Sequence, residues 1–251
     1  ASMNKNSIVI IPCYNEEKRL ETEVYLDSIK KLPEISILFV NDGSNDRTLE
    51  VLKNIANQLP EQISILNSVK NGGKANAIYE GGREALKKKP AYIGYIDADL
   101  AVSLEAFNEL LEFAIKENKN FVFGSRWKRI GSTIDRKLSR HLIGRFFATL
   151  SSNLLNLDVY DTQCGAKVMD NKTAKHVFKQ PFTTNWIFDV EIFFRLLQIF
   201  PKERFADHAI EFPLKEWHDV EGSKLNFSHS INILRDFIVL RKKYGGTKVK
   251  K

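Results

Sequence analysis

Hydrophobic residues in the first half of the chain form short, nearly uninterrupted runs, separated by segments with helical periodicity. The runs that we expect to be strands are Ser7–Ile11, Ile35–Val40, Ile63–Leu66, Tyr92–Ile96 and Phe121–Phe123. The segments between them that we expect to be helices are Glu16–Lys31, Asp46–Leu59, Gly72–Lys88 and, starting from the capping residue Ser103, Ser103–Glu117. Apolar strands that alternate with helices are typical of a parallel sheet covered on both faces. The pattern therefore predicts an α/β fold with right-handed connections and a ligand site at the carboxyl ends of the strands.

The second half of the chain is less regular, and the alternation of strands and helices stops near residue 125. We expect helices over Arg136–Leu157 and Phe188–Phe200, and strands over Cys164–Met169 and Ile210–Pro213. There is no internal repeat and no clean domain boundary. The 251 residues, 43% hydrophobic and 27% charged, have globular composition. This length fits one large α/β domain or two fused half-domains.

The net charge of +7 is concentrated near the C-terminal end. From residue 235 onward there are seven basic residues and one acid, Asp236. A nucleic-acid-binding protein would gather its basic residues on a patch interleaved with aromatics, so this class is not favoured. No apolar run approaches the roughly 20 residues of a membrane-spanning helix. Cys13, Cys164 and the five histidines show no metal-ligand spacing, so we expect free thiols in a reducing compartment.

An apolar helical pattern directly precedes the basic tail. It consists of Ile231, Leu234, Phe237, Ile238 and Leu240. Two interpretations are open. The segment is either an interfacial helix that lies on an anionic membrane surface, with the cationic residues 241–243 at its end, or a helix packed on the core with a frayed tail.

Polar side chains follow three of the predicted strands, at the edge where the carboxyl ends of parallel strands meet. They are Asn15 and Glu16, Asn41 and Asp42, and Asp97 and Asp99. Each alone is an ordinary turn residue, but their joint occurrence indicates a site. The Asp97-Ala98-Asp99 triplet offers oxygen ligands to a hard divalent cation, which typically uses one or two carboxylates and completes its shell with water and substrate phosphate. Such a cation would neutralise a diphosphate leaving group.

Asn71-Gly72-Gly73-Lys74 precedes a predicted helix, where close backbone approach and a helix N-terminus favour an anion. It is not a P-loop, since Ala75 follows the lysine and Ser68 stands at the place of the leading glycine. No GxGxxG follows the first strand, and no GxSxG is present. Phosphotransfer of the P-loop kind, dinucleotide redox chemistry and serine hydrolysis therefore lose their main support.

Four segments occur in a characteristic order along the chain: Pro12–Glu16, Asn41–Thr48, Asn71–Lys74 and Asp97–Leu100. Together they resemble the family 2 glycosyltransferases, inverting enzymes of the GT-A fold. Further motifs in the second half resemble the polyprenyl-phosphate sugar synthases, most of all the dolichyl-phosphate β-glucosyltransferases and next the mannose synthases. These motifs are Gly124–Arg126, Asp161–Gly165, Phe188–Glu191 and Glu221–Lys224. Ala166 and His218 depart from the pattern and leave the sugar open.

This resemblance implies a single large α/β domain with a mostly parallel, Rossmann-like sheet flanked by helices. It divides into a nucleotide-sugar half (3–125), an acceptor half (126–228) and an amphipathic helix with a basic tail (229–251). The resemblance implies a donor site formed by Pro12, Tyr14, Glu16, Asp42, Lys74, Asp97, Ala98, Asp99 and Lys224. Asp99, with Asp97, would bind Mg²⁺ or Mn²⁺.

The acceptor implied is a polyprenyl phosphate, whose monoester is mostly dianionic at pH 7 because its second pKa is near ~6. It needs positioning more than a general base. The candidates for binding the acceptor phosphate are Arg126, Arg136 and Arg140, because the guanidinium fork matches phosphate oxygens. Asp161 would act as base or support the metal, and a glycan hydroxyl acceptor would need it as a true base.

The donor is expected to be UDP-glucose, with GDP-mannose as the alternative, and no nucleic acid is involved. A catalytically silent GT-A scaffold is the remaining alternative, and the intact acids and lysines argue against it. Residues 229–251 would hold the protein peripherally on the cytoplasmic face of the membrane.

Overall fold

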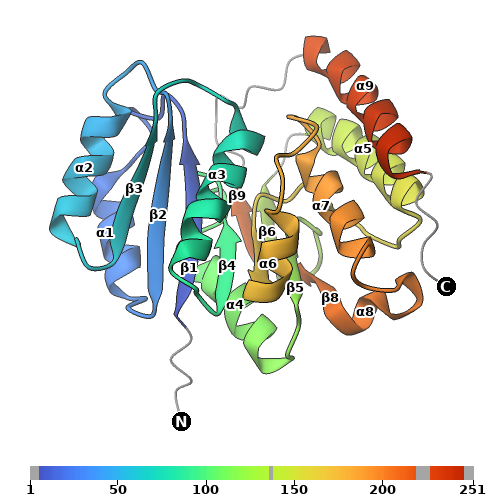
Figure 1. Ribbon diagram of the computed structural model, residues 1–251, viewed down its shortest axis with the longest axis horizontal. Coiled ribbons are helices and arrows are strands. Elements are labelled where there is room, and N and C mark those ends of the chain that lie inside the picture. Colours follow the sequence, from blue (N-terminus) through green and yellow to red (C-terminus); the bar gives the residue numbers. More distant parts are fainter. Residues whose placement is uncertain (1–5, 136–137, 219–226, 246–251) are drawn as a thin grey trace.

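The computed structural model describes residues 6–135, 138–218 and 227–245. They form one seven-stranded sheet of order β3-β2-β1-β4-β7-β5-β8, with helices on both faces, and a small sheet of β6 and β9 (Figure 1). The strands are β1 (Ser7–Cys13), β2 (Ile35–Asp42), β3 (Ile63–Ser68), β4 (Tyr92–Tyr95), β5 (Phe121–Ser125), β6 (Thr133–Asp135), β7 (Lys167–Asp170), β8 (Ala209–Pro213) and β9 (Glu216–His218). The predicted α/β class with a mostly parallel sheet is confirmed.

The helices are α1 (Thr22–Lys30), α2 (Thr48–Gln58), α3 (Lys74–Lys87), α4 (Leu104–Lys116), α5 (Leu138–Leu155), α6 (Asn171–Val177), α7 (Phe188–Leu197), α8 (Phe205–His208) and α9 (Phe227–Tyr244), with a 3₁₀ turn η1 (Lys202–Arg204) before α8. The Ser103 hydroxyl accepts from the N–H of Ala106 and caps α4 as expected.

Each face of the sheet has its own hydrophobic core, because successive strand residues point to opposite faces. Val9 and Ile11 of β1 pack in the core beneath α1, α2 and α4. Ile8 and Ile10 pack in the other core, to which α3, α5, α6, α7 and α9 contribute. Strands buried on both faces explain why the apolar runs of the sequence are continuous rather than alternating.

Strand β7 runs antiparallel to both of its neighbours, β4 and β5. It was expected to begin at Cys164, but it begins at Lys167 and pairs Val168 with Gly94 on one side and with Val122 on the other. The reversal brings the loop before β7 to the edge where β4 and β5 end. Short elements with little periodicity, β6, β9, α6 and α8, were not predicted.

The first helix begins at Thr22, not at Glu16 as expected. Residues 16–20 form turns, with the N–H groups of Arg19 and Leu20 donating to the carbonyl of Glu16. The N–H of Glu16 donates to the Thr48 hydroxyl at 2.8 Å, and that of Glu17 donates to Asp46 at 3.2 Å. These bonds to the loop after β2 hold the segment out of a helix.

The C-terminal helix α9 is longer than predicted and packs on the core through Ile233, Phe237, Leu240 and Tyr244. In Figure 1 it lies alongside α5, and the rings of Phe147 and Phe237 stack with centroids 6.3 Å apart. Core packing is thus part of its role, and Phe237 and Leu240 are not free for a membrane. Among the described residues, no helix combines the length and apolar character that crossing a bilayer requires.

Candidate active site

The loops after β1 and β2 are joined to each other at the carboxyl edge of the sheet. The N–H of Asn15 donates to the Ser44 hydroxyl, and the Asn15 side chain accepts from the N–H of Asn45 at 2.9 Å. Arg47 pairs with Glu17 at 2.7 Å. The structure thus brings together the loops that carry Tyr14 and Glu16 and the strand end that carries Asp42, as the sequence predicted; their contact with a nucleoside remains a prediction.

Asp42 holds the glycine turn that opens α3. Its two carboxylate oxygens accept from the N–H groups of Gly72 and Gly73, each at 2.8 Å. Gly73 has φ +85°, a conformation that favours glycine, and lies at the N-cap of α3 without a side-chain cap. The Asp42 carboxylate therefore fixes the turn that places Lys74 at the first position of the helix.

Lys74 meets the Asp97-Ala98-Asp99 turn after β4. Its Nζ lies 2.5 Å from Oδ1 of Asp97. Burial alone would lower the pKa of Lys74, but the attraction of Asp97, and then of Asp189, outweighs this and raises the pKa. Ala98 is buried, and its carbonyl accepts from the Tyr25 hydroxyl at 2.7 Å, which fixes the turn from α1.

Burial, and then the negative charge of Asp97, raises the pKa of Asp99. Two carboxylates this close together form a donor set that a divalent cation would stabilise. No cluster of three or more potential metal-binding side chains occurs among the described residues. Asp97 and Asp99 therefore fit Mg²⁺ or Mn²⁺ only in the mode that takes two carboxylates and completes its shell with substrate phosphate and water.

On the other side of the site, Arg126 forms an ion pair with Asp161. Nε donates to Oδ2 at 2.7 Å and Nη2 to Oδ1 at 2.8 Å, and the backbone N–H of Arg126 also donates to Oδ2. Burial alone would lower the pKa of Arg126, but Asp161 outweighs it and raises the pKa, so the guanidinium stays charged. The ring of Trp217 lies 5.5 Å from the guanidinium carbon.

The loop between α5 and β7 joins the two charged pairs. It carries Asp161 and, four residues further on, Gly165, which packs so tightly on Asp97 that an added Cβ would clash with Oδ2. Only a glycine allows this approach. One short loop thus contacts both the Lys74–Asp97 pair and the Arg126–Asp161 pair.

Several polar residues beneath this loop were missed or underrated by the sequence reasoning. Glu211 of β8 accepts from the N–H groups of Tyr160 and Asp161. Lys167, which is fully buried, donates to the Cys164 carbonyl and to Asp189. A glutamate in a short apolar strand and a lysine at the start of an otherwise apolar strand were the available signals. Asp189 and Glu191 have separate partners, because Glu191 bonds instead to Arg195 and Tyr244.

Other predicted site residues lie outside the described residues or side chains. Arg136 and Lys224 are outside the described residues, and Arg140 lies on α5 with its side chain outside them. Their roles stay predictions. Pro12 lies in β1, in register with Val40.

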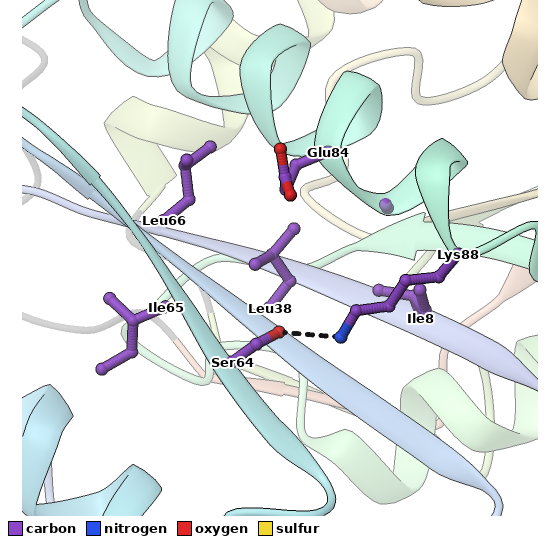
Figure 2. A pocket seen from close by; sticks show the side chains of 8 residues that line it. Ile8, Leu38, Ser64, Ile65, Leu66, Glu84 and Lys88 are labelled. Carbon is purple, nitrogen blue, oxygen red and sulfur yellow. Dashed lines mark hydrogen bonds between the residues drawn. The ribbon is translucent and has the colours of Figure 1, made fainter.

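A hollow of about 90 Å³ lies between β3 and α3 (Figure 2). It is lined largely by aliphatic side chains, with Lys88 donating to the Ser64 hydroxyl at 3.4 Å across it. Lys88 lies at the end of α3 opposite Lys74. The hollow is therefore remote from the charged pairs and is not part of the site.

Comparison with known proteins identifies the family. The glycosyl transferase family 2 model matches residues 8–178. The dolichyl-phosphate β-glucosyltransferase of Dictyostelium discoideum is 31% identical over 96% of this chain and 77% of that protein. The human dolichyl-phosphate β-glucosyltransferase is 30% identical over 97% of this chain and 77% of that protein.

Solved structures share the fold. Glucosyl-3-phosphoglycerate synthase from Mycobacterium tuberculosis, in complex with Mn²⁺, UDP and glucosyl-3-phosphoglycerate, superposes with a TM-score of 0.65 at 16% identity, over 96% of this chain and 80% of that one. A mannosyltransferase from Pyrobaculum calidifontis, in complex with GDP-mannose and Mn²⁺, gives a TM-score of 0.63 at 15% identity, over 99% of this chain and 67% of that one. The predicted GT-A fold is thus confirmed, and the chain belongs to glycosyltransferase family 2.

Proposed function

We propose that this glycosyltransferase transfers glucose from UDP-glucose to a polyprenyl phosphate, with inversion at the anomeric carbon. The relatives that match nearly the whole chain are dolichyl-phosphate β-glucosyltransferases. The observation that carries the proposal is the presence of two ion pairs, Lys74–Asp97 and Arg126–Asp161, which are both contacted by one loop. The Lys74–Asp97 pair suits a diphosphate donor, and the Arg126–Asp161 pair suits a phosphate acceptor.

On the donor side, Lys74 and the N-terminus of α3 face the diphosphate, because both favour an anion. Asp97 and Asp99 would hold Mg²⁺ or Mn²⁺, which supplies charge neutralisation for the diphosphate. The Asp42 carboxylate keeps the glycine turn in place, since it bonds to both glycine N–H groups. Tyr14, Glu16 and Lys224 complete the proposed donor site.

On the acceptor side, Arg126 orients the lipid phosphate, with Arg136 and Arg140 as further candidates. An oxygen of the dianionic phosphate attacks the anomeric carbon, and the bond from that carbon to the diphosphate oxygen breaks, with the electron pair leaving on the diphosphate. No proton needs to be removed, because the monoester is already a nucleophile at pH 7. Asp161 then serves chiefly to fix Arg126, not to take a proton.

We further propose that the enzyme works at the cytoplasmic face of a membrane, where its acceptor is embedded. Two surfaces support this. Leu234 and Ile238 of α9 are 45% and 57% exposed and lie among exposed basic residues of the same helix. Trp127 is 51% exposed and Ile130 fully exposed, on a turn that also carries Lys128 and Arg129. Apolar tips among cations suit an anionic interface.

The test is transfer of labelled sugar to a short polyprenyl phosphate in detergent, with Mn²⁺ or Mg²⁺, comparing UDP-glucose with GDP-mannose. We expect turnover with UDP-glucose and its loss when a chelator removes the metal. Turnover with GDP-mannose alone would overturn the donor but keep the reaction class. Transfer to a glycan hydroxyl instead of the lipid phosphate would overturn the acceptor.

A further inference from the structure

The loop of residues 160–165 is held by a half-buried anion at its start. Glu211 Oε2 accepts from the N–H of Tyr160 at 2.9 Å, and Oε1 accepts from the N–H of Asp161 at 2.8 Å. Burial raises the pKa of Glu211, and the two N–H groups partly offset this. Among the described residues, no cationic side chain pairs with it. Its two oxygens therefore accept from two consecutive backbone groups, with the Ser125 side chain as a further hydrogen-bond partner.

A buried cation holds the other end of the same loop. Lys167 Nζ donates to the carbonyl of Cys164 at 2.7 Å and to Oδ1 of Asp189 at 2.6 Å. Lys167 is 0% exposed, and the Tyr95 hydroxyl donates to the same Asp189 oxygen at 2.5 Å. The polarity matches at each end, since the anion accepts from N–H groups and the cation donates to a carbonyl.

Between these two anchors lie the contacts that matter for the site. At the Glu211 end of the loop, Asp161 forms hydrogen bonds with Arg126. At the Lys167 end, Gly165 packs on Asp97. Burying a charged group is unfavourable unless the group is fully hydrogen-bonded. Charge used to hold backbone in this way gives stiffness at a point where small displacements are costly to catalysis.

We propose that Glu211 and Lys167 are positioning residues for glycosyl transfer, which together set the separation of the acceptor pair Arg126–Asp161 from the donor pair Lys74–Asp97. This assignment rests on the proposed function of those two pairs. Neither positioning residue contacts substrate. Glu211 acts through Asp161, and Lys167 acts through Gly165 and Asp97.

The first test needs no substrate. Hydrogen exchange of the backbone amides of Tyr160 and Asp161 is measured in the wild type, in Glu211→Gln and in the exposed control Glu203→Gln. Glutamine presents one oxygen and one N–H₂ group where glutamate presents two acceptors, so one of the two amides loses its partner. We expect faster exchange over residues 160–161 in Glu211→Gln alone. Unchanged exchange there would overturn the Glu211 assignment, whatever the acceptor is.

The second test is kinetic and uses a double-mutant cycle. Glu211→Gln should lower kcat by about 10-fold or more and leave the KM for the nucleotide sugar within about twofold, because the donor side is untouched. In an Asp161→Asn background the same change should add less than about twofold. Equal losses in both backgrounds would show a general structural effect and overturn the proposal. If Glu211→Gln melts below the assay temperature, Glu211→Asp retracts the same two oxygens and serves in its place.

The Lys167 end has a different signature. Lys167→Gln should raise the KM for the nucleotide sugar several-fold, because Gly165 is free to shift against Asp97, and should change kcat less. The double variant Lys167→Gln with Asp189→Asn leaves no buried charge unpaired and should show the same KM rise if the single variant folds poorly. An unchanged KM in a folded variant would overturn this half. If the wild type transfers nothing to a polyprenyl phosphate, the proposed function fails, while the exchange experiment still decides the Glu211 anchor.

Discussion

Arg126 and Asp161 form a two-pronged ion pair in which Nε and Nη2 of the guanidinium donate to the two carboxylate oxygens, at 2.7 and 2.8 Å. The side chains are 17% and 8% exposed. The geometry fixes the cation in one orientation, which suits recognition of a phosphate. It leaves the carboxylate largely committed to the arginine.

Variants of this ion pair distinguish between a lipid phosphate acceptor and a glycan hydroxyl acceptor. With a lipid phosphate, Asp161→Asn should lower kcat by about 10-fold, because Arg126 is less well fixed but no proton transfer is lost. With a glycan hydroxyl, the same change should cost about 10²- to 10⁴-fold, the usual contribution of a general base. Initial rates on the two acceptor types, with Arg126→Lys as the matched variant of the partner, decide between them. Under the phosphate proposal Arg126→Lys should be at least as damaging as Asp161→Asn.

The Asp97-Ala98-Asp99 turn predicts metal dependence. Asp99→Asn should abolish detectable transfer while the protein stays folded, because an amide is a poorer ligand for a hard cation. Circular dichroism and thermal melting provide the control for folding. Normal turnover by Asp99→Asn in the presence of a chelator would contradict both the metal and the role of this residue.

The contact of Gly165 with Asp97 predicts an unusually sensitive glycine. Gly165→Ala places a methyl group where the Asp97 carboxylate lies, so the carboxylate must move and the KM for the nucleotide sugar should rise by about 10-fold or more. Gly131→Ala is the control, because its Cβ would meet nothing within 4 Å although its φ of +81° is strained. The control should lose only about 1 kcal/mol of stability and keep its KM. Equal KM values in the two variants would contradict the prediction.

Glu191 predicts how stability depends on pH. It is 0% exposed and bonds to the Thr183 N–H, to Arg195 and to the Tyr244 hydroxyl at the end of α9. Burial alone would raise its pKa, but the Thr183 N–H and then Arg195 outweigh this and lower it from 4.5. Ionised Glu191 therefore stabilises the fold above pH 4.5, and this stability is lost as the pH falls through the lowered pKa of the folded state.

Glu191→Gln should accordingly cost about 3–5 kcal/mol at pH 7, as expected for breaking a buried pair. Its melting temperature should approach that of the wild type as the pH falls below 4.5. Thermal melts between pH 3 and pH 7 at constant ionic strength measure the difference. Asp207→Asn, which breaks an exposed pair with Arg204, should show no measurable shift. A constant gap between Glu191→Gln and wild type at all pH values would count against the prediction.

The exposed face of α9 predicts membrane binding. Changing Leu234 and Ile238 together to glutamate should reduce binding to anionic phospholipid vesicles by about 10-fold or more, because apolar contact is lost and negative charge is added. Both side chains face outward, so the fold should persist. Val24→Glu, on the exposed side of α1, is the control. Deleting residues 229–251 is a poorer test, since Leu240 and Tyr244 belong to the core. Unchanged vesicle binding by the double variant would refute this role of α9.

Much of the fold was predictable because strands that are buried on both faces consist of nearly continuous runs of apolar residues. Strands β1 to β5 and helices α2 to α4 fall where hydrophobic periodicity placed them. The start of α1 was misplaced because hydrogen bonds that the N–H groups of Glu16 and Glu17 donate to Thr48 and Asp46, about thirty residues away, decide it. Strands β6 and β9 pair only with each other and are three residues long, so they carry almost no pattern.

The site was predictable to the extent that it follows strand ends. The charged pairs involve Asp97 and Lys74, which adjoin strand or helix ends, and Arg126 and Asp161, which belong to recognisable motifs. The anchors Glu211 and Lys167 were not predictable, since their roles arise from the reversed pairing of β7 and from register with β5. The sequence alone does not indicate with which backbone groups a charged side chain will form hydrogen bonds.

The position of β7 has a consequence for how the chain folds while it is being synthesised on the ribosome. Strand β5 is synthesised about forty residues before β7, yet β7 lies between β5 and β4 in the finished sheet. A nascent chain that has emerged only as far as α5 therefore has the sheet fragment β3-β2-β1-β4 and strand β5, whose two partners, β7 and β8, are still to come. The insertion of β7 joins them and in the same step carries Asp161 and Gly165 to their partners. An incomplete chain that lacks β7 thus has the proposed donor residues without the proposed acceptor pair Arg126–Asp161 in place, and we expect it to transfer no sugar until β7 has paired.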